Sequence, residues 1–152
     1  MIEEQEKYLG VSQRIHQQTT RLMALAPNDQ YEWKPSETSM TLGKLMNHMM
    51  LGEWAICEAA LTGVFPREEM KEFTDTTELI AAFDQQHKGF VTRLTALTPE
   101  QWNEDIQPFG PDKKRPRHEL LRILQEHEIH HRGQLYVYLR MLGCQVPSLF
   151  GG

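Results

Sequence analysis

The sequence has few of the features that define specialised classes of protein. Its two cysteines, Cys57 and Cys144, follow no C-x-x-C spacing, so we expect reduced buried thiols and no disulfide framework. No apolar run approaches the length that spans a bilayer, and the charged segment 1–7 lacks the apolar core of a signal peptide. We therefore expect a cytoplasmic protein with no membrane partner.

The chain also lacks an excess of positive charge. Its net charge is −5 over 152 residues, so it has no general attraction for phosphate backbones and no nucleic acid partner is expected. The basic run 113–117 is short and contains no aromatic residue, which is typical of a solvated loop. The length suits a single domain, 1–152, that folds without a structural metal. A metal in such a protein would have a chemical role.

Strand-like alternation and internal repeats are absent as well. Helical periodicity covers four long segments, about 2–26, 41–61, 76–97 and 117–142, separated by clusters of Pro, Gly, Asn and Asp. Thr98 and Pro99 predict a further short helix, with threonine as the N-cap and proline in the first turn. Four amphipathic helices in one domain predict an all-α fold, an up-down-type four-helix bundle.

The last predicted helix carries two histidines on its apolar face. His127 and His131 lie four residues apart, so their imidazoles are one turn apart and can reach one metal ion. They stand where the stripe otherwise carries residues such as Leu124, Leu135 and Tyr138. Buried imidazoles need polar partners. A shared metal would provide one, and the alternative is a pair of ordinary core histidines bonded to carbonyls or water.

These two histidines also match H-E-x-x-H, the signature of zinc proteases. Those enzymes generally take a third ligand downstream, and the residues after His131 include no His, Asp or Glu. A third ligand must therefore come from upstream. His118 is over two turns away along the same helix, and His16 lies at the edge of its stripe. Spacing leaves His48 and His87 as rivals, with His48 slightly ahead.

Three segments carry a resemblance to a known family: WKP at 33–35, TLGKLMNH at 41–48 and HEIHHRGQ at 127–134. Together they resemble the DinB superfamily, which includes the YfiT-like group of metal-dependent hydrolases and the bacillithiol transferases. The resemblance covers nearly the whole chain, and its last segment is the most specific. It implies a four-helix bundle, often a homodimer, in which His48, His127 and His131 hold a divalent metal, nickel or zinc. It returns His87 to a structural role.

A site of three neutral histidines leaves the ion its full charge and one position open for water or substrate. Such an ion lowers the pKa of bound water and can hold a thiol as thiolate. We therefore expect a metal-dependent enzyme that acts on a small molecule, either a hydrolase or, by family analogy alone, a thiol S-transferase. The alternatives are a non-catalytic stress-response or ligand-binding module that keeps the metal site, and a bundle without metal.

Several polar residues near these histidines are candidates for supporting roles, although none is assigned as a general base. Glu128 is expected to point along the wall of the site or away from it. A supporting or surface carboxylate is commoner at such a position than a general base. Glu53 could fix the tautomer of a ligand imidazole, and Arg132 is expected at the surface or a subunit interface. The others divide between solvent or interface positions (Glu126, His130) and positions without an assigned role (Asn47, Gln134).

Overall fold

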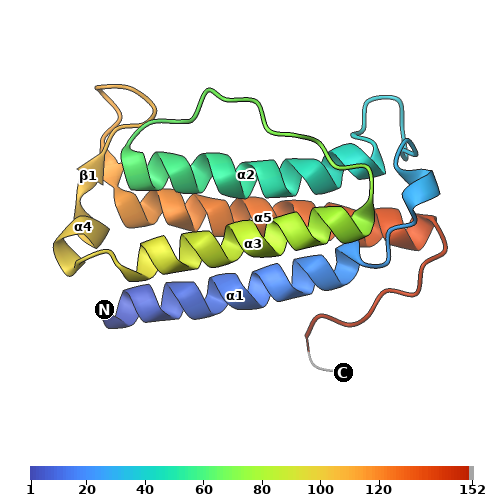
Figure 1. The fold of residues 1–152 in the computed structure, drawn as a ribbon, viewed down its shortest axis with the longest axis horizontal. Coiled ribbons are helices and arrows are strands. Elements are labelled where there is room, and N and C mark those ends of the chain that lie inside the picture. The colour runs from blue at the N-terminus through green and yellow to red at the C-terminus, as the bar shows by residue number, and fades with distance from the viewer. Residues whose placement is uncertain (151–152) are drawn as a thin grey trace.

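Four long helices form a bundle in the computed structural model, which describes residues 1–150 (Figure 1). They are α1 (Glu3–Met23), α2 (Leu42–Thr62), α3 (Thr76–Thr95) and α5 (Arg117–Met141). The shorter elements are the 3-10 helix η1 (Asn28–Gln30), α4 (Pro99–Asn103), β1 (Asp105–Ile106) and β2 (Arg115–Pro116). The predicted all-α four-helix bundle is confirmed, and the last two residues of the expected domain lie outside the described residues.

Local capping chemistry explains where the helices begin and end. Thr41 Oγ1 accepts from the amide of Lys44 at 3.1 Å at the start of α2. The Asp75 carboxylate accepts from the amide of Glu78 at 3.0 Å at the start of α3. Gly63 ends α2 with a φ of 83°, a conformation that favours glycine. These contacts occupy backbone groups that a helix leaves free at its ends.

The short strands β1 and β2 are the part of the fold that the sequence did not predict. They pair antiparallel, with Asp105 opposite Pro116 and Ile106 opposite Arg115. The pairing closes the loop between α4 and α5. Strands of two residues are too short to show the alternation by which a strand is detected in a sequence.

The order of helix directions depends on a long connection between α2 and α3. Contacts of Met50 with Gln86 and of Glu58 with Arg93 advance in the same direction along both helices, so α2 and α3 are parallel. The connection 63–75 therefore returns along the length of the bundle, as Figure 1 shows. The pairs α1–α3 and α2–α5 are antiparallel. This connection modifies the strict alternation of an up-down bundle.

Apolar side chains fill the bundle in two clusters, one toward each end, and the interior between them is polar. One cluster includes Leu22, Met46, Phe83 and Leu135, and the other includes Leu9, Cys57, Phe90 and Leu121. Cys57 is buried and Cys144 is partly exposed, so the prediction of two buried thiols holds for Cys57 alone. Within residues 1–150, none of the helices has the length and apolar character to cross a membrane.

Candidate metal centre

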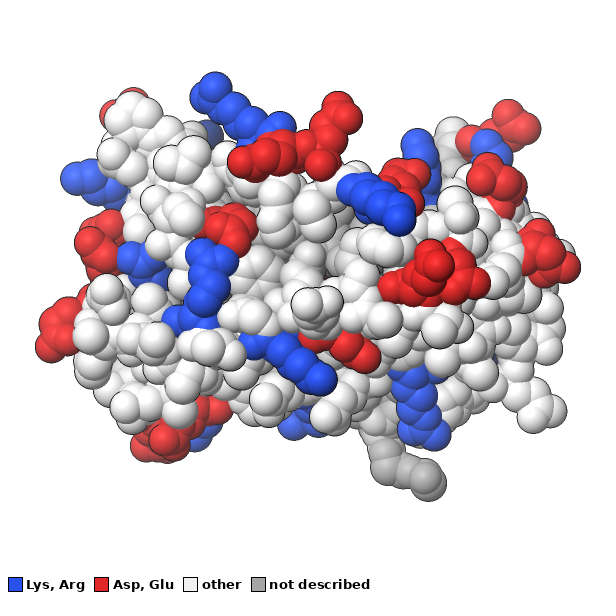
Figure 2. Space-filling model, in the orientation of Figure 1, with Lys and Arg blue, Asp and Glu red and all other residues white. Residues whose placement is uncertain are grey.

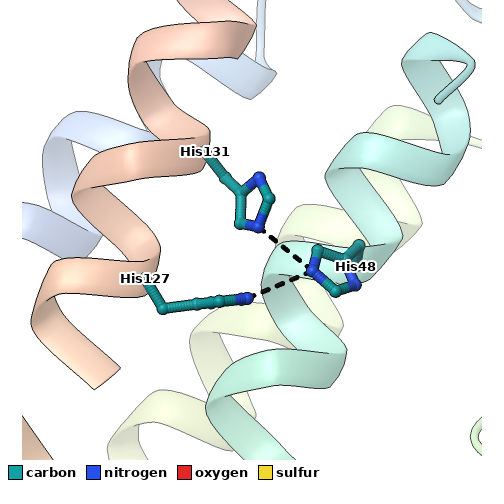
Figure 3. A group of neighbouring side chains, drawn as sticks. All are labelled: His48, His127 and His131. Atoms are coloured by element: carbon teal, nitrogen blue, oxygen red, sulfur yellow. Dashed lines mark hydrogen bonds between the residues drawn. The ribbon is translucent and has the colours of Figure 1, made fainter. Parts of the chain in front are cut away.

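His48, His127 and His131 lie together in the structure, as Figure 3 shows. His48 projects from α2, and the other two project from successive turns of α5. The Nε2 atom of His48 lies 3.1 Å from Nε2 of His127 and 3.1 Å from Nε2 of His131. Nitrogen atoms of all three rings lie within 4.8 Å of one another. The three imidazoles therefore converge between two helices.

The hydrogen bonds at the three rings supply fewer protons than the converging Nε2 atoms can accept. His131 Nδ1 lies 2.7 Å from Oε1 of Gln134. An amide oxygen only accepts, so Nδ1 carries the ring proton and Nε2 of neutral His131 is a lone pair. His48 Nε2 faces both this lone pair and His127 Nε2, and one proton there cannot fully satisfy two acceptors. A cation between the rings would satisfy all three, so this donor set could hold a metal ion.

The surroundings favour neutral imidazoles, which is the form that binds metals. Burial, and then the nearby His131 ring, lower the pKa of His48. Burial and the neighbouring rings of His131, His48 and His130 lower the pKa of His127 to about 4. The cause is the cost of placing positive charge away from water and beside other imidazoles. At neutral pH these two rings can bind a cation without first losing a proton.

Gly52 makes room for the His127 ring. A Cβ atom at this position would lie 2.4 Å from Cε1 and 2.8 Å from Nδ1 of His127, closer than non-bonded atoms approach. Gly52 follows His48 by one turn of α2 and therefore shares its side of the helix. His127 Nδ1 is buried and has no hydrogen-bond partner within residues 1–150. On its Nδ1 side, packing against Gly52 and not a hydrogen bond sets the position of this ring.

A surface hollow of about 620 Å³ opens beside His48. Asn47 fixes the connection that forms one wall of this hollow. Its Nδ2 donates to the carbonyl of Phe73 at 2.9 Å, and its Oδ1 accepts from the amide of Phe73 at 2.8 Å. The three-histidine cluster therefore adjoins space for a small molecule. Methionines and charged side chains line this space, among them Met40, Lys44, Met50, Glu69, Met70 and Lys71.

Charges of both signs are spread over the face that Figure 2 shows. Lysines and arginines stand beside aspartates and glutamates, and no part of this face carries a broad field of one sign. Proteins that bind nucleic acid backbones usually present such a basic field.

Glu53 and Glu128, the two carboxylates considered for supporting roles, turn away from the three converging histidines. Glu53 accepts a hydrogen bond from His87 Nδ1 at 2.8 Å, so it positions His87 and not one of the three converging histidines. Gln134 takes the orienting role that the sequence suggested for Glu53. Glu128 lies in the bundle interior and not at the surface. There, burial and the nearby carboxylate of Glu53 raise the pKa of Glu128 to about 7.

Arg132 is buried within the chain, in contrast to the expected position at the surface or a subunit interface. Its guanidinium donates to Oε1 of Gln18 at 2.5 Å and lies 5.9 Å from the centre of the Phe150 ring. Gln18 also donates to the carbonyl of Leu149 at 2.9 Å. The C-terminal segment therefore packs against α1 and α5 and covers Arg132. Two other expected surface residues are exposed, Glu126 and His130.

The fold and the converging histidines define a helical-bundle protein with a candidate metal centre. A model of the DinB family matches residues 1–151, and the chain belongs to this family. It is 33% identical to YjoA of Bacillus subtilis (strain 168) over 129 residues, which cover 82% of each chain. The crystal structure of YjoA, a DinB-like protein, has a TM-score of 0.81 at 27% identity, covering 94% of this chain and 97% of YjoA.

Two more distant structures share the fold. YfiT from Bacillus subtilis is described as a probable metal-dependent hydrolase with an unusual four-helix bundle topology. Its TM-score is 0.73 at 15% identity, with 95% of this chain and 91% of YfiT covered. The mycothiol-dependent maleylpyruvate isomerase has a TM-score of 0.56 at 19% identity, with 95% of this chain and 65% of the isomerase covered.

Sequence reasoning missed Gly52, and it named Gln134 near the histidines without assigning it a role. A signal for Gly52 was present, because glycine inside a helix costs about 1 kcal/mol relative to alanine, and this one lies a turn after His48. The signal for Gln134 was its spacing of three residues from His131, which places both on one side of the helix. Neither signal names the atom that the residue contacts.

Proposed function

We propose that this protein is a metal-dependent enzyme that acts on a small molecule, with His48, His127 and His131 as ligands of one divalent ion, zinc or nickel. The observation that supports the proposal is the convergence of three Nε2 atoms around His48, which lines a hollow of about 620 Å³. A chain of this size needs no structural metal to fold. A metal here would therefore serve binding or chemistry.

The chemistry that fits such a centre is activation of a bound oxygen or sulfur. Three neutral ligands leave a dication with its full charge, which lowers the pKa of water or a thiol at an open position. The chain contributes the geometry. Gln134 holds His131 with Nε2 free, and Gly52 seats the His127 ring.

Two reactions are proposed, hydrolysis and thiol S-transfer. The positions of the carboxylates favour thiol S-transfer. Glu53 and Glu128 face the core, and among the described residues the glutamates that line the hollow, Glu69 and Glu72, come from the connection 63–75. Hydrolysis usually needs a placed base, whereas a thiolate is itself the nucleophile. The shared fold of a mycothiol-dependent isomerase supports a thiol, and that of YfiT supports hydrolysis.

A homodimer is part of this proposal. The outer face of α5 exposes the apolar side chains Ile129, Val137 and Met141, with exposed fractions of 44%, 53% and 58%. Exposed apolar side chains on one helix face are a usual feature of subunit interfaces.

Cobalt substitution tests the proposed reaction class. The Co²⁺-loaded protein is titrated with 2-mercaptoethanol and followed by absorbance in the near ultraviolet, where a cobalt–thiolate bond absorbs. We expect a new band that His127→Ala abolishes, and a lowered pKa of the bound thiol. Cobalt uptake without any thiol band would instead support the second candidate, a non-catalytic ligand-binding or stress-response module that keeps the metal. The hollow beside His48 favours the enzyme.

A further inference from the structure

A second hollow adjoins the one at His48 and lies between α2, α3 and the connection 63–75, which we call the α3 hollow. Its volume is about 450 Å³, which is within the range of sites that hold small molecules. Met50, Met70 and Lys71 line both hollows. The two spaces therefore share a wall, and molecules in them would lie side by side.

Apolar side chains form most of the inner surface of the α3 hollow. Met50 and Phe90 belong to the bundle interior, whereas Phe73 and Met70 come from the connection that passes over it. The Nζ atom of Lys71 lies 5.0 Å from the centre of the Phe73 ring. An apolar molecule in this space would remove these side chains further from water, which favours binding. Its polar end would find the Lys71 ammonium beside the aromatic surface.

Gly89 leaves the α3 side of this hollow open. It lies inside α3, where glycine costs about 1 kcal/mol of helix stability relative to alanine. A Cβ atom at Gly89 would meet nothing within 4 Å, so close packing is not the reason for glycine here. A side chain at this position would instead extend from the wall of the hollow. The missing side chain keeps space available for a ligand.

The charged side chains that line the α3 hollow are both basic, Lys71 and Arg93. Arg93 is paired with the carboxylate of Glu58 through both of its terminal nitrogens. Lys71 forms no ion pair within residues 1–150, and the nearby acidic residues Glu69 and Glu72 line the hollow at His48 instead. An apolar space with one unpaired cation and no acidic lining suits a molecule that carries a single negative charge.

We propose that the α3 hollow binds a small organic acid, with its apolar body against Met50, Phe73 and Phe90 and its carboxylate at Lys71. This binding goes beyond the proposed function, because none of these contacts needs a metal ion. The shared wall places the acid next to a molecule bound in the hollow at His48. The protein would therefore hold two ligands in adjoining sites.

Titration of chelator-treated protein with 2-naphthoate, followed by isothermal titration calorimetry, tests the location of the site. We expect saturable binding of one molecule per chain. Gly89→Leu fills the hollow and should weaken binding by at least about tenfold. Leucine is a better helix former than glycine, so this variant should keep or raise the thermal midpoint. The matched control is Gly10→Leu on α1, where a Cβ also meets nothing within 4 Å, and its affinity should equal that of wild type.

Lys71→Met tests the recognition of the carboxylate, since methionine keeps an unbranched apolar side chain and removes the charge. We expect 2-naphthoate to bind about two- to fivefold more weakly, the range for an exposed ion pair, and the neutral 2-naphthamide to be unaffected. The control is Lys88→Met on α3, which borders a separate hollow at His16.

Three results would overturn the proposal. They are no saturable binding to wild type at millimolar 2-naphthoate, equal affinities of wild type and Gly89→Leu, and equal binding of acid and amide that Lys71→Met does not change. Because the protein is freed of metal before titration, these results are independent of whether the three histidines hold an ion.

Discussion

The bundle places histidines in two interior regions with different consequences. At the three-histidine centre the free nitrogens face one another at 3.1 Å beside a surface hollow. In the core cluster, formed by His16, Glu53, His87 and Glu128, the rings of His16 and His87 are stacked, each ring is paired with a carboxylate, and the adjoining cavity is small. The placement of protons and the access from solvent, more than the number of histidines, therefore determine what a histidine cluster can bind.

The partners behind the rings differ in charge as well. His131 is oriented by a neutral amide, that of Gln134, whereas His87 is oriented by the carboxylate of Glu53. Neutral ligands and a neutral support leave a bound dication strongly electrophilic, while carboxylates offset its charge. The first region therefore suits activation of a substrate by a bound dication.

Gly52→Ala should reduce Zn²⁺ affinity more than the other substitutions do. It tests the packing of the His127 ring against Gly52. The added Cβ would occupy the space of the ring, so the variant loses a ligand. We expect Zn²⁺ affinity to fall by more than about 100-fold, beyond the usual effect of a lost supporting hydrogen bond. Competition with a chromophoric chelator measures it. The control is Gly133→Ala on α5, where a Cβ meets nothing within 4 Å; equal affinities of the two variants would contradict the assigned packing.

Gln134→Leu tests the support of His131 and should have a smaller effect. Without the amide oxygen, His131 loses the partner that fixes its proton on Nδ1. The expected fall in Zn²⁺ affinity is about 10–100-fold. Gln134→Glu should restore binding, because a carboxylate also accepts from Nδ1, and it makes the first centre resemble the core cluster. Failure of this rescue would show that the hydrogen bond is not what positions the ring.

Glu128→Gln should change how the free energy of unfolding depends on pH. Urea unfolding of chelator-treated protein measures this dependence. The pKa of Glu128 is about 7 in the folded protein, against an ordinary value of 4.5. The folded state therefore holds the proton more tightly, and this stabilisation is lost as pH rises from 4.5 through 7. Relative to wild type, the variant should gain roughly 2 kcal/mol between pH 5 and pH 8. A constant difference across this range would show that Glu128 is not held protonated.

Much of the fold and part of the site follow from sequence periodicity. The stripe through Leu124, His127, His131 and Leu135 predicts both α5 and the inward histidine pair, and the structure contains both. The third member of the cluster depended on the family resemblance, because periodicity left His48 and His87 as rivals, with His48 only slightly ahead. Periodicity shows which face of a helix points inward. It does not show which residues of different helices come into contact, because that depends on how the helices pack.

The position of Glu128 in the core cluster could not be predicted from periodicity either. Glu128 lies one residue, and so about 100° around the helix, from His127, and the sequence allowed it to face the site or turn away from it. The rotation of α5 against α1 and α2 decides that it faces inward. Likewise, the parallel pair α2 and α3 depends on the path of the connection 63–75, whose residues carry no sign of direction.

The central claim is tested most directly by the zinc and nickel content of tag-free protein, before and after His48→Ala. We expect the content of these two metals to fall by about one ion per chain in the variant while the helical circular dichroism is retained. Equal metal content in both proteins, or none in the wild type after reconstitution, would contradict the assignment of His48, His127 and His131 as a metal centre.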